Sequence, residues 1–209
     1  MVEAGGMPPR RSALGDVLAP RRAGPDAALP GVSLSAGPAR AIWQISAWRE
    51  ADTEPLRGAL GAQLGLSLPE GPAAASEGGD VLFRVAPRRW WLVLAEEDSG
   101  NDLGARLAAA VTGRAALTDL SHARTVLRLR GPASRMVLQK LCRIDLHPRA
   151  LPAGRIAQTQ LGQVAALIHA FDDGPSFDLY LPRSLAYSGA ESLIDAATEF
   201  GVAISGQAG

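Results

Sequence analysis

The sequence predicts an α+β protein with mostly antiparallel sheets and packed helices, joined to an extended N-terminal arm. The 209 residues are 47% hydrophobic, which is enough apolar material for a sizeable core. Short strand-like runs occur in pairs with tight turns, and single helical patterns lie between the pairs. Because parallel strands need a long crossover, this order favours antiparallel pairing. We therefore expect an arm over residues 1–39 and one α+β domain over residues 40–209.

Residues 1–39 have the composition of an extended, proline-rich segment. They contain six of the fifteen prolines and no aromatic residue. Such a stretch cannot bury enough surface to fold alone. It still carries apolar residues such as Leu14, together with the basic pair Arg10 and Arg11. Two interpretations stay open, an arm laid across a partner protein and a mobile tail without contacts.

The first half of the domain predicts a strand, a helix, a hairpin and a second helix. Aromatic and β-branched residues favour a strand over residues 41–48. Leucines at helical spacing then predict a helix that ends at Gly65. The elements expected after it are a surface loop at 69–80, a hairpin of strands 81–86 and 90–95, and a helix at 101–112.

The second half predicts a similar order of elements. They are strands at 115–120 and 124–130, a helix that starts at Pro132, strands at 155–161, 163–169 and 176–181, and a last helix at 184–200. Both halves thus share the order strand, helix, strand, strand, helix. An internal duplication is our hypothesis for this likeness, and poor superposition of the two halves would remove it.

Charge and cysteine content exclude several classes of protein. The 21 basic and 21 acidic residues balance, so nothing draws the whole chain toward nucleic acid or anionic lipid. The apolar runs are far shorter than the about 20 residues of a membrane span. No apolar signal core follows the first arginines, and we expect a cytoplasmic protein. Cys142 is the only cysteine, which excludes an internal disulfide and a multi-cysteine metal site built by this chain alone.

Asp119, Ser121 and His122 contain the residue types of a hydrolytic triad. Ser121 and His122 are adjacent, so they point to opposite faces of an extended chain, and no G-x-S-x-G elbow surrounds the serine. A polar turn explains the acid and the serine better.

The three histidines and the single cysteine are the other side chains that could bind a metal ion. The three histidines, His122, His147 and His169, and Cys142 show neither H-E-x-x-H nor C-x-x-C spacing. We expect His169 to be hydrogen-bonded at a strand end and Cys142 to be an inert packing thiol. The sequence therefore predicts no metal site in this chain.

The run Arg88, Arg89, Trp90 and Trp91 places basic charge beside aromatic surface. Neighbouring residues of a strand face opposite sides, so we expect one of the two tryptophans to be at least partly exposed at a partner surface. The alternative is a hairpin with one tryptophan in the core. No glycine-rich phosphate loop is found, so dinucleotide binding by this chain is not predicted.

The segment D-L-S-H-A-R-T-V-L-R-L-R-G, residues 119–131, and the P-A-S-R-M-V-L-Q-K-L-C that follows resemble the gamma subunit of heterotetrameric sarcosine oxidase. The likeness extends over nearly the whole chain. Further matching segments are R-S-A-L at 11–14, L-G-L-S-L-P-E at 64–70, P-R-R-W-W-L-V at 87–93, D-L-H-P-R-A-L-P-A-G-R-I-A-Q-T-Q-L at 145–161 and F-D-L-Y-L-P-R-S at 177–184.

That family is similar in turn to the folate-binding domain of the glycine-cleavage aminomethyltransferase, and the resemblance implies the same α+β fold. In the aminomethyltransferase an aspartate after the glycine turn of a hairpin assists chemistry at folate. Here Val164, Ala165 and Ala166 occupy that place, and Asp172 and Asp173 lie at the far end of the strand. The resemblance thus implies no catalytic carboxylate and no cofactor held by this chain.

The resemblance implies a non-catalytic structural subunit. Its partners would be the alpha, beta and delta subunits, which would hold FAD, FMN, NAD, tetrahydrofolate and zinc and would oxidatively demethylate sarcosine or a related N-methyl amine. Residues that we expect to contact these partners are Arg10, Arg11, Leu14, Trp90, Trp91, His122, Arg124, His147 and Arg149.

Two rival functions remain. One is a stand-alone, folate-dependent or RNA-modifying relative of the aminomethyltransferase, although its K-G-C-Y-x-G-Q-E segment is not matched by K-L-C-R-I-D around Cys142. The other is an unrelated hydrolase that uses Ser121 and His122.

Overall fold

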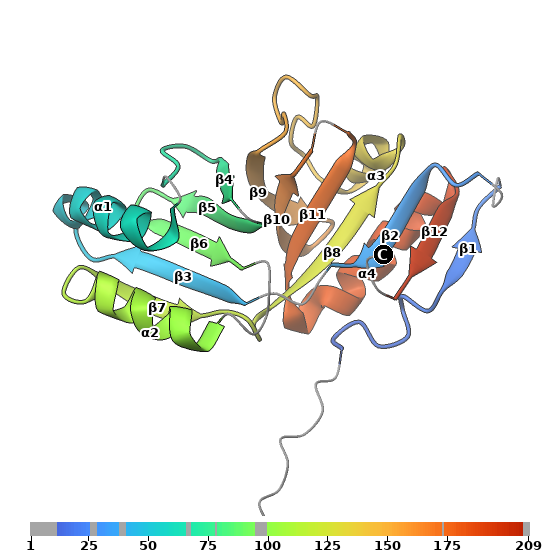
Figure 1. Cartoon of the computed structure of the whole chain (residues 1–209). Helices are drawn as coiled ribbons and strands as arrows, with labels where there is room; N and C mark the ends of the chain where they lie inside the picture. Colours follow the sequence, from blue (N-terminus) through green and yellow to red (C-terminus); the bar gives the residue numbers. More distant parts are fainter. Residues whose placement is uncertain are drawn as a thin grey trace, which may run out of the picture.

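Two β-sheets that pack against each other form the centre of the protein, and a pair of helices lies on each outer side (Figure 1). This computed structural model describes residues 12–25, 29–37, 41–65, 68–77, 79–94, 100–172 and 174–206. Pairing is antiparallel except between β12 and β2. The α+β class with mostly antiparallel sheets is therefore confirmed.

The first sheet has five strands in the order β4-β5-β6-β3-β7. Its strands are β3 (Ile42–Ala47), β4 (Ala74–Glu77), β5 (Asp80–Ala86), β6 (Arg89–Val93) and β7 (Ala115–Asp119). Two helices cover its outer face, α1 (Thr53–Leu64), which follows the 3-10 turn η1 (Glu50–Asp52), and α2 (Gly100–Val111). Leu56, Leu60, Leu107 and Val111 are buried there against the sheet, as their helical spacing predicted.

The second sheet has seven strands in the order β1-β12-β2-β8-β11-β10-β9. Its strands are β1 (Arg21–Ala23), β2 (Val32–Ala36), β8 (Arg124–Arg130), β9 (Arg155–Leu161), β10 (Val164–Ala170), β11 (Ser176–Pro182) and β12 (Val202–Ser205). The helices α3 (Ser134–Leu141) and α4 (Ala186–Thr198), the latter after the 3-10 turn η2 (Arg183–Leu185), pack on its outer face. This half holds the largest apolar cluster.

The inner faces of the two sheets share a third apolar cluster. Phe83 and Val93 from the five-stranded sheet meet Leu167 and Tyr180 from the seven-stranded sheet. The sheets are also joined at one edge, where the amide of Ala74 donates to the carbonyl oxygen of Gly154 (2.8 Å). The two halves are therefore fastened both by packing and by backbone hydrogen bonds.

The N-terminal segment departs from the predicted arm. Its second strand, β2, lies between β12 and β8 in the seven-stranded sheet, and Leu14, Val17 and Leu18 are buried in the core of that half. A domain boundary at residue 40 is therefore wrong for the described part of residues 1–39. Composition shows only that this segment does not fold alone. The segment is ordered because it completes a sheet whose other strands come from residues 124–205.

Two further strands were not predicted. β4 lies inside the expected loop at 69–80, and β12 follows the last helix after the left-handed turn at Gly201. Both are four residues long. Such short runs carry too few alternating positions to stand out in a sequence, and pairing with a neighbour decides their conformation.

Trp90 and Trp91 face opposite sides of β6, as alternation requires, but neither is exposed. Trp90 is 1% exposed and packs toward α1 and α2, and Trp91 is 6% exposed and belongs to the cluster between the sheets. The expectation of an exposed tryptophan at these positions is wrong, because both faces of this sheet are covered.

The connectivity agrees with the internal duplication. The first half runs β3-α1-β4-β5-β6-α2-β7, and the second runs β8-α3-β9-β10-β11-α4-β12. The sheet order β4-β5-β6-β3-β7 then corresponds to β9-β10-β11-β8-β12, with β2 inserted before the last strand. The N-terminal segment thus supplies two strands without a counterpart in the first half, β2 within the sheet and β1 at its edge.

Candidate functional site

The Asp119 and Ser121 pair forms a turn that supports the fold. Ser121 donates to Oδ1 of Asp119 through both its amide (2.8 Å) and its hydroxyl (2.5 Å). The Ser121 oxygen also accepts the amide hydrogen of Ile42 (3.0 Å), the first residue of β3. The predicted polar turn is confirmed. The Ser121 oxygen is already hydrogen-bonded within the connection between β7 and β8, which joins the two sheets.

A cavity of about 240 Å³ opens between the sheets near this link. Its walls come from β3, β5 and β6 on one side and from β8 to β11 on the other. The lining residues are Gln44, Val85, Arg89, Trp91, Arg124, Gln158, Thr159, Ala165, Ala166, Leu167 and Tyr180. Ala165 and Ala166 stand where the resemblance places the catalytic carboxylate of the aminomethyltransferase. The Ala165 side chain shares the inner face of β10 with Leu167, so this wall of the cavity is apolar, whereas the Ala166 side chain packs in the outer core cluster.

Arg124 is the half-buried cation of this cavity. Its guanidinium carbon lies 4.7 Å from the ring centre of Trp91, and the Trp91 indole N–H donates to Oε1 of Gln44 (3.0 Å). Burial lowers the pKa of Arg124 from its usual value. Sequence reasoning named Arg124 as a partner contact, whereas the structure places it inside the chain between two sheets.

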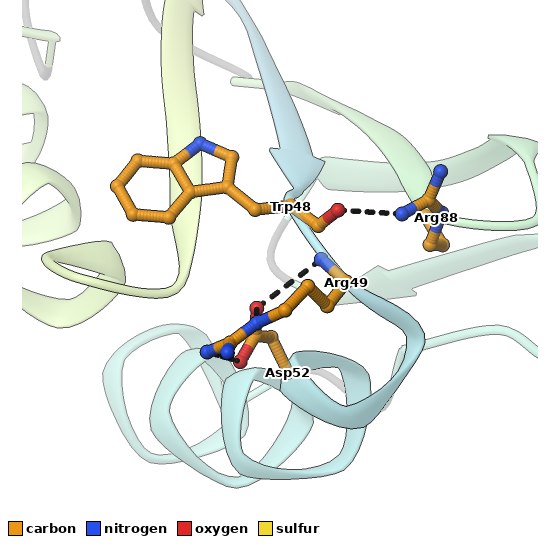
Figure 2. A network of polar contacts seen from close by, with 4 residues as sticks. All are labelled: Trp48, Arg49, Asp52 and Arg88. Carbon is orange, nitrogen blue, oxygen red and sulfur yellow. Dashed lines mark hydrogen bonds and ion pairs between the residues drawn. The ribbon is translucent and has the colours of Figure 1, made fainter.

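Trp48 is a large aromatic side chain at the surface, with an exposed fraction of 57%. It follows directly after β3, and its carbonyl oxygen accepts a hydrogen bond from Arg88 (2.6 Å). Beside it, Arg49 pairs with Asp52 (3.1 Å), and this hydrogen bond holds the pKa of Asp52 below its usual value. Figure 2 shows the indole directed away from this polar network. Trp48 was not predicted as a surface residue, because its place in the pattern of residues 41–48 suits a strand, whereas β3 ends at Ala47.

The other predicted contact residues are distributed unevenly. Arg10 and Arg11 lie outside the described residues, and Leu14 is 3% exposed, within the chain's own core. His122, His147 and Arg149 are exposed. The ring Nδ1 of His147 accepts the amide hydrogen of Arg149 (3.2 Å), so these two residues form a local turn. The structure therefore does not gather the seven residues that it describes into one patch.

Cys142 is buried, and its thiol donates to the carbonyl oxygen of Leu138 (3.1 Å). Burial raises the pKa of the Cys142 thiol, which suits a packing role. Within the described ranges, no three His, Cys, Asp or Glu side chains are grouped to hold a metal ion. The helices that the structure describes are all too short or too polar to cross a membrane.

The fold is that of a GCVT-like α+β protein, and residues 76–208 match the family model of the GCVT N-terminal domain. The chain is 38% identical to the sarcosine oxidase subunit gamma of Arthrobacter sp. over 146 residues, 68% of this chain and 70% of the relative. It is 36% identical to the subunit of the same name from Corynebacterium sp. strain P-1, again over 146 residues, with 68% and 70% of the two chains covered. The protein therefore belongs to the family of sarcosine oxidase gamma subunits, and that predicted resemblance is confirmed.

Solved structures agree with this assignment. A chain of the heterotetrameric sarcosine oxidase from Corynebacterium sp. U-96 matches with a TM-score of 0.76 and 27% identity, covering 91% of this chain and 96% of that chain. The glycine cleavage system aminomethyltransferase T from Bartonella henselae matches with a TM-score of 0.56 and 19% identity, over 85% of this chain and 48% of that chain. The second likeness is one of fold.

Proposed function

We propose that this chain is a non-catalytic structural subunit of a heterotetrameric, flavin-dependent sarcosine oxidase. Its partners are alpha, beta and delta subunits, and the assembly works in the cytoplasm on sarcosine or a related N-methyl amine. In this proposal FAD, FMN, NAD, tetrahydrofolate and zinc are held by the partners. The observation that carries the proposal is the match over 96% of a chain of the heterotetrameric enzyme, since the likeness covers a whole subunit.

The cavity supports a role without chemistry in this chain. The resemblance to the aminomethyltransferase implies a carboxylate as the group that assists chemistry at folate, and the residues that line this cavity include neither Asp nor Glu. The Ser121 oxygen, the other candidate reacting atom, is bound to Asp119 and to the amide of Ile42.

Trp48 is the contact that we assign to a partner subunit. Tryptophan and arginine are the residues that most often dominate binding energy at protein interfaces. Here a half-exposed indole lies beside Arg49, whose side chain is 74% exposed, and Arg88, which is also exposed. We expect the partner surface to offer an apolar pocket with an acidic rim.

Co-expression with tagged alpha, beta and delta subunits tests the proposal. We expect the chain to co-purify in stoichiometric amount, and the Trp48→Ala variant to be recovered in the complex at least about tenfold less. Tyr187→Ala is the matched control, because Tyr187 is also an exposed aromatic residue, at 41%, but lies on α4 of the other half.

The activity of the purified complex separates a structural role from a catalytic one. We expect complexes that contain Ser121→Ala or His122→Ala to keep the sarcosine oxidation rate of the wild type. A loss of about 100-fold in kcat at normal complex recovery would show a chemical role for the substituted residue. Recovery of the chain as a free monomer alone would contradict the assembly proposal.

The likeness of fold to aminomethyltransferase T favours one rival, a folate-binding protein that works alone. Calorimetry of the full chain with tetrahydrofolate decides between the two. Micromolar or tighter binding by the isolated chain supports the rival, and binding by the complex alone supports the structural subunit.

A further inference from the structure

The cavity between the sheets carries positive charge without a balancing carboxylate. Arg89 and Arg124 are the lining residues with a charge at neutral pH, and no Asp or Glu lines the space. In the part of the chain that the structure describes, no carboxylate pairs with Arg124, and its Nε–H is buried without an acceptor. A half-buried cation without a counter-charge lowers stability, and an anionic ligand in the cavity supplies the missing counter-charge.

The orientation of Arg124 is set before any ligand arrives. Its guanidinium lies over the Trp91 ring at 4.7 Å, and Trp91 is held in place by the hydrogen bond to Gln44 (3.0 Å). Stacking leaves the edge of a planar guanidinium available for hydrogen bonds in its own plane. Such a fixed fork matches the two oxygens of a carboxylate, which it binds through paired hydrogen bonds.

Size and wall chemistry restrict the ligand. The cavity volume of 240 Å³ corresponds to roughly eight water molecules and lies below the about 300 Å³ at which pockets for drug-sized ligands begin. Beside the arginines, part of the wall is aliphatic, formed by Val85, Ala165 and Leu167. Arg89, which is exposed, lies at the solvent side. A short acid with its head group on a cation fits both parts of this wall.

We propose that the cavity binds a free, compact carboxylic acid, whose carboxylate pairs with Arg124 and whose short aliphatic part lies against Ala165 and Leu167. Arg89 adds attraction at the mouth. This site goes beyond the structural role proposed above, since assembly of the oxidase does not require it.

The test is calorimetry and thermal unfolding of the full chain with acetate, propionate, butyrate and hexanoate at constant ionic strength, with chloride as the salt control. Binding is saturable and raises the melting temperature. Affinity increases up to about fourfold per methylene group until the cavity is full, so each longer acid from acetate to hexanoate binds more tightly than the one before it.

Variants assign the binding to the cavity. Arg124→Met lowers the affinity for butyrate at least about tenfold, as loss of a charged hydrogen-bond pair requires. Arg124→Lys keeps the charge without the fork and gives an intermediate loss. Arg149→Met, a change of an exposed arginine that does not line the cavity, leaves the affinity unchanged. Ala165→Leu fills part of the cavity and leaves Arg124 in place, so it lowers the affinity for butyrate more than the affinity for acetate.

Stability without ligand distinguishes a binding arginine from a packing one. If Arg124 serves a ligand, Arg124→Met melts no lower than the wild type in chloride alone and gains nothing from butyrate. A lower melting temperature together with unchanged acid binding overturns the proposal, since Arg124 then serves only the stacking on Trp91. Should Arg124→Met fail to fold, the series on Ala165→Leu and Arg124→Lys carries the same test.

The same experiments distinguish a free carboxylic acid from other anions and from an acidic side chain of a partner subunit. Equal effects of chloride and butyrate, or binding of phosphate without binding of the acids, overturn the carboxylate assignment. The Arg124→Met chain is recovered in the oxidase complex in normal amount if the ligand is a free acid. The opposite outcome is that the Arg124→Met chain is not recovered in the complex and that the free wild-type chain binds no acid. That outcome contradicts a free ligand and assigns the cavity to an acidic side chain of a partner subunit.

Discussion

The buried ion pair between Arg128 and Asp178 makes the sharpest prediction about stability. The two residues are directly opposed on β8 and β11, and two hydrogen bonds of 2.6 and 2.7 Å join the guanidinium to the carboxylate. The side chains are only 14% and 5% exposed. Hydrogen bonding to Asp178 raises the pKa of Arg128, so the charged pair is favoured in the folded state.

Removing one partner leaves the other charge buried and unpaired. We expect Asp178→Asn and Arg128→Met each to lower the free energy of unfolding by about 3–5 kcal/mol. For a domain with a urea m-value of about 2–3 kcal/mol/M, the midpoint then falls by about 1–2.5 M. The double variant Arg128→Met/Asp178→Leu is less destabilised than either single variant, because no uncompensated charge remains.

Urea unfolding followed by circular dichroism measures all three variants. The matched control is Glu199→Gln, which breaks the exposed pair with Lys140 (2.9 Å, side chains 65% and 41% exposed) and costs at most about 1 kcal/mol. Single-variant losses as small as that of the control would refute the reasoning. So would a double variant whose loss equals the sum of the two singles, since the residues would then not be coupled.

Three further predictions concern a glycine, a carboxylate and the thiol. Gly131→Ala lowers the free energy of unfolding by about 3 kcal/mol or more, because Gly131 has φ of 120° and a Cβ atom would lie 2.5 Å from the carbonyl oxygen of Gly31. The control Gly162→Ala lowers it by about 1–2 kcal/mol, since Gly162 has φ of 60° but open space around the added Cβ atom. The hydrogen bond from Arg49 lowers the pKa of Asp52 in the folded chain, which stabilises the fold above about pH 4. This stabilisation is lost as the pH falls through the folded pKa, so the urea midpoints of wild type and Asp52→Asn converge at low pH. Cys142, with a raised pKa, reacts with a disulfide reagent at least about tenfold more slowly in the folded chain than in urea.

Each of these has a contradicting result. Equal losses for the two glycine variants would show that the close carbonyl does not matter. A stability difference between wild type and Asp52→Asn that grows toward low pH would reverse the sign argued for the carboxylate. Rapid labelling of Cys142 under native conditions would show that its surroundings open easily.

Local patterns predicted the elements with strong periodicity. The strand β8 has the predicted bounds, 124–130. The helix α1 ends at Leu64, and the next residue, Gly65, adopts the left-handed conformation that a helix stop uses. The turn at Asp119 and Ser121 was also readable, since both side chains can bond the backbone two residues away. The family resemblance rests on the same central segment and follows from residue identities alone.

What the sequence by itself determined was the α+β class, the helices and long strands, and the family, because spacing and residue types encode these locally. The tertiary structure alone decided that β2 completes a sheet with β8 and β12, that both tryptophans of β6 are covered, and that Arg124 lines a cavity while Trp48 lies at the surface. Burial of β2 and of the two tryptophans depends on surfaces supplied by residues far away in the chain. No local pattern contains those surfaces, so exposure and pairing emerge only when the two sheets meet.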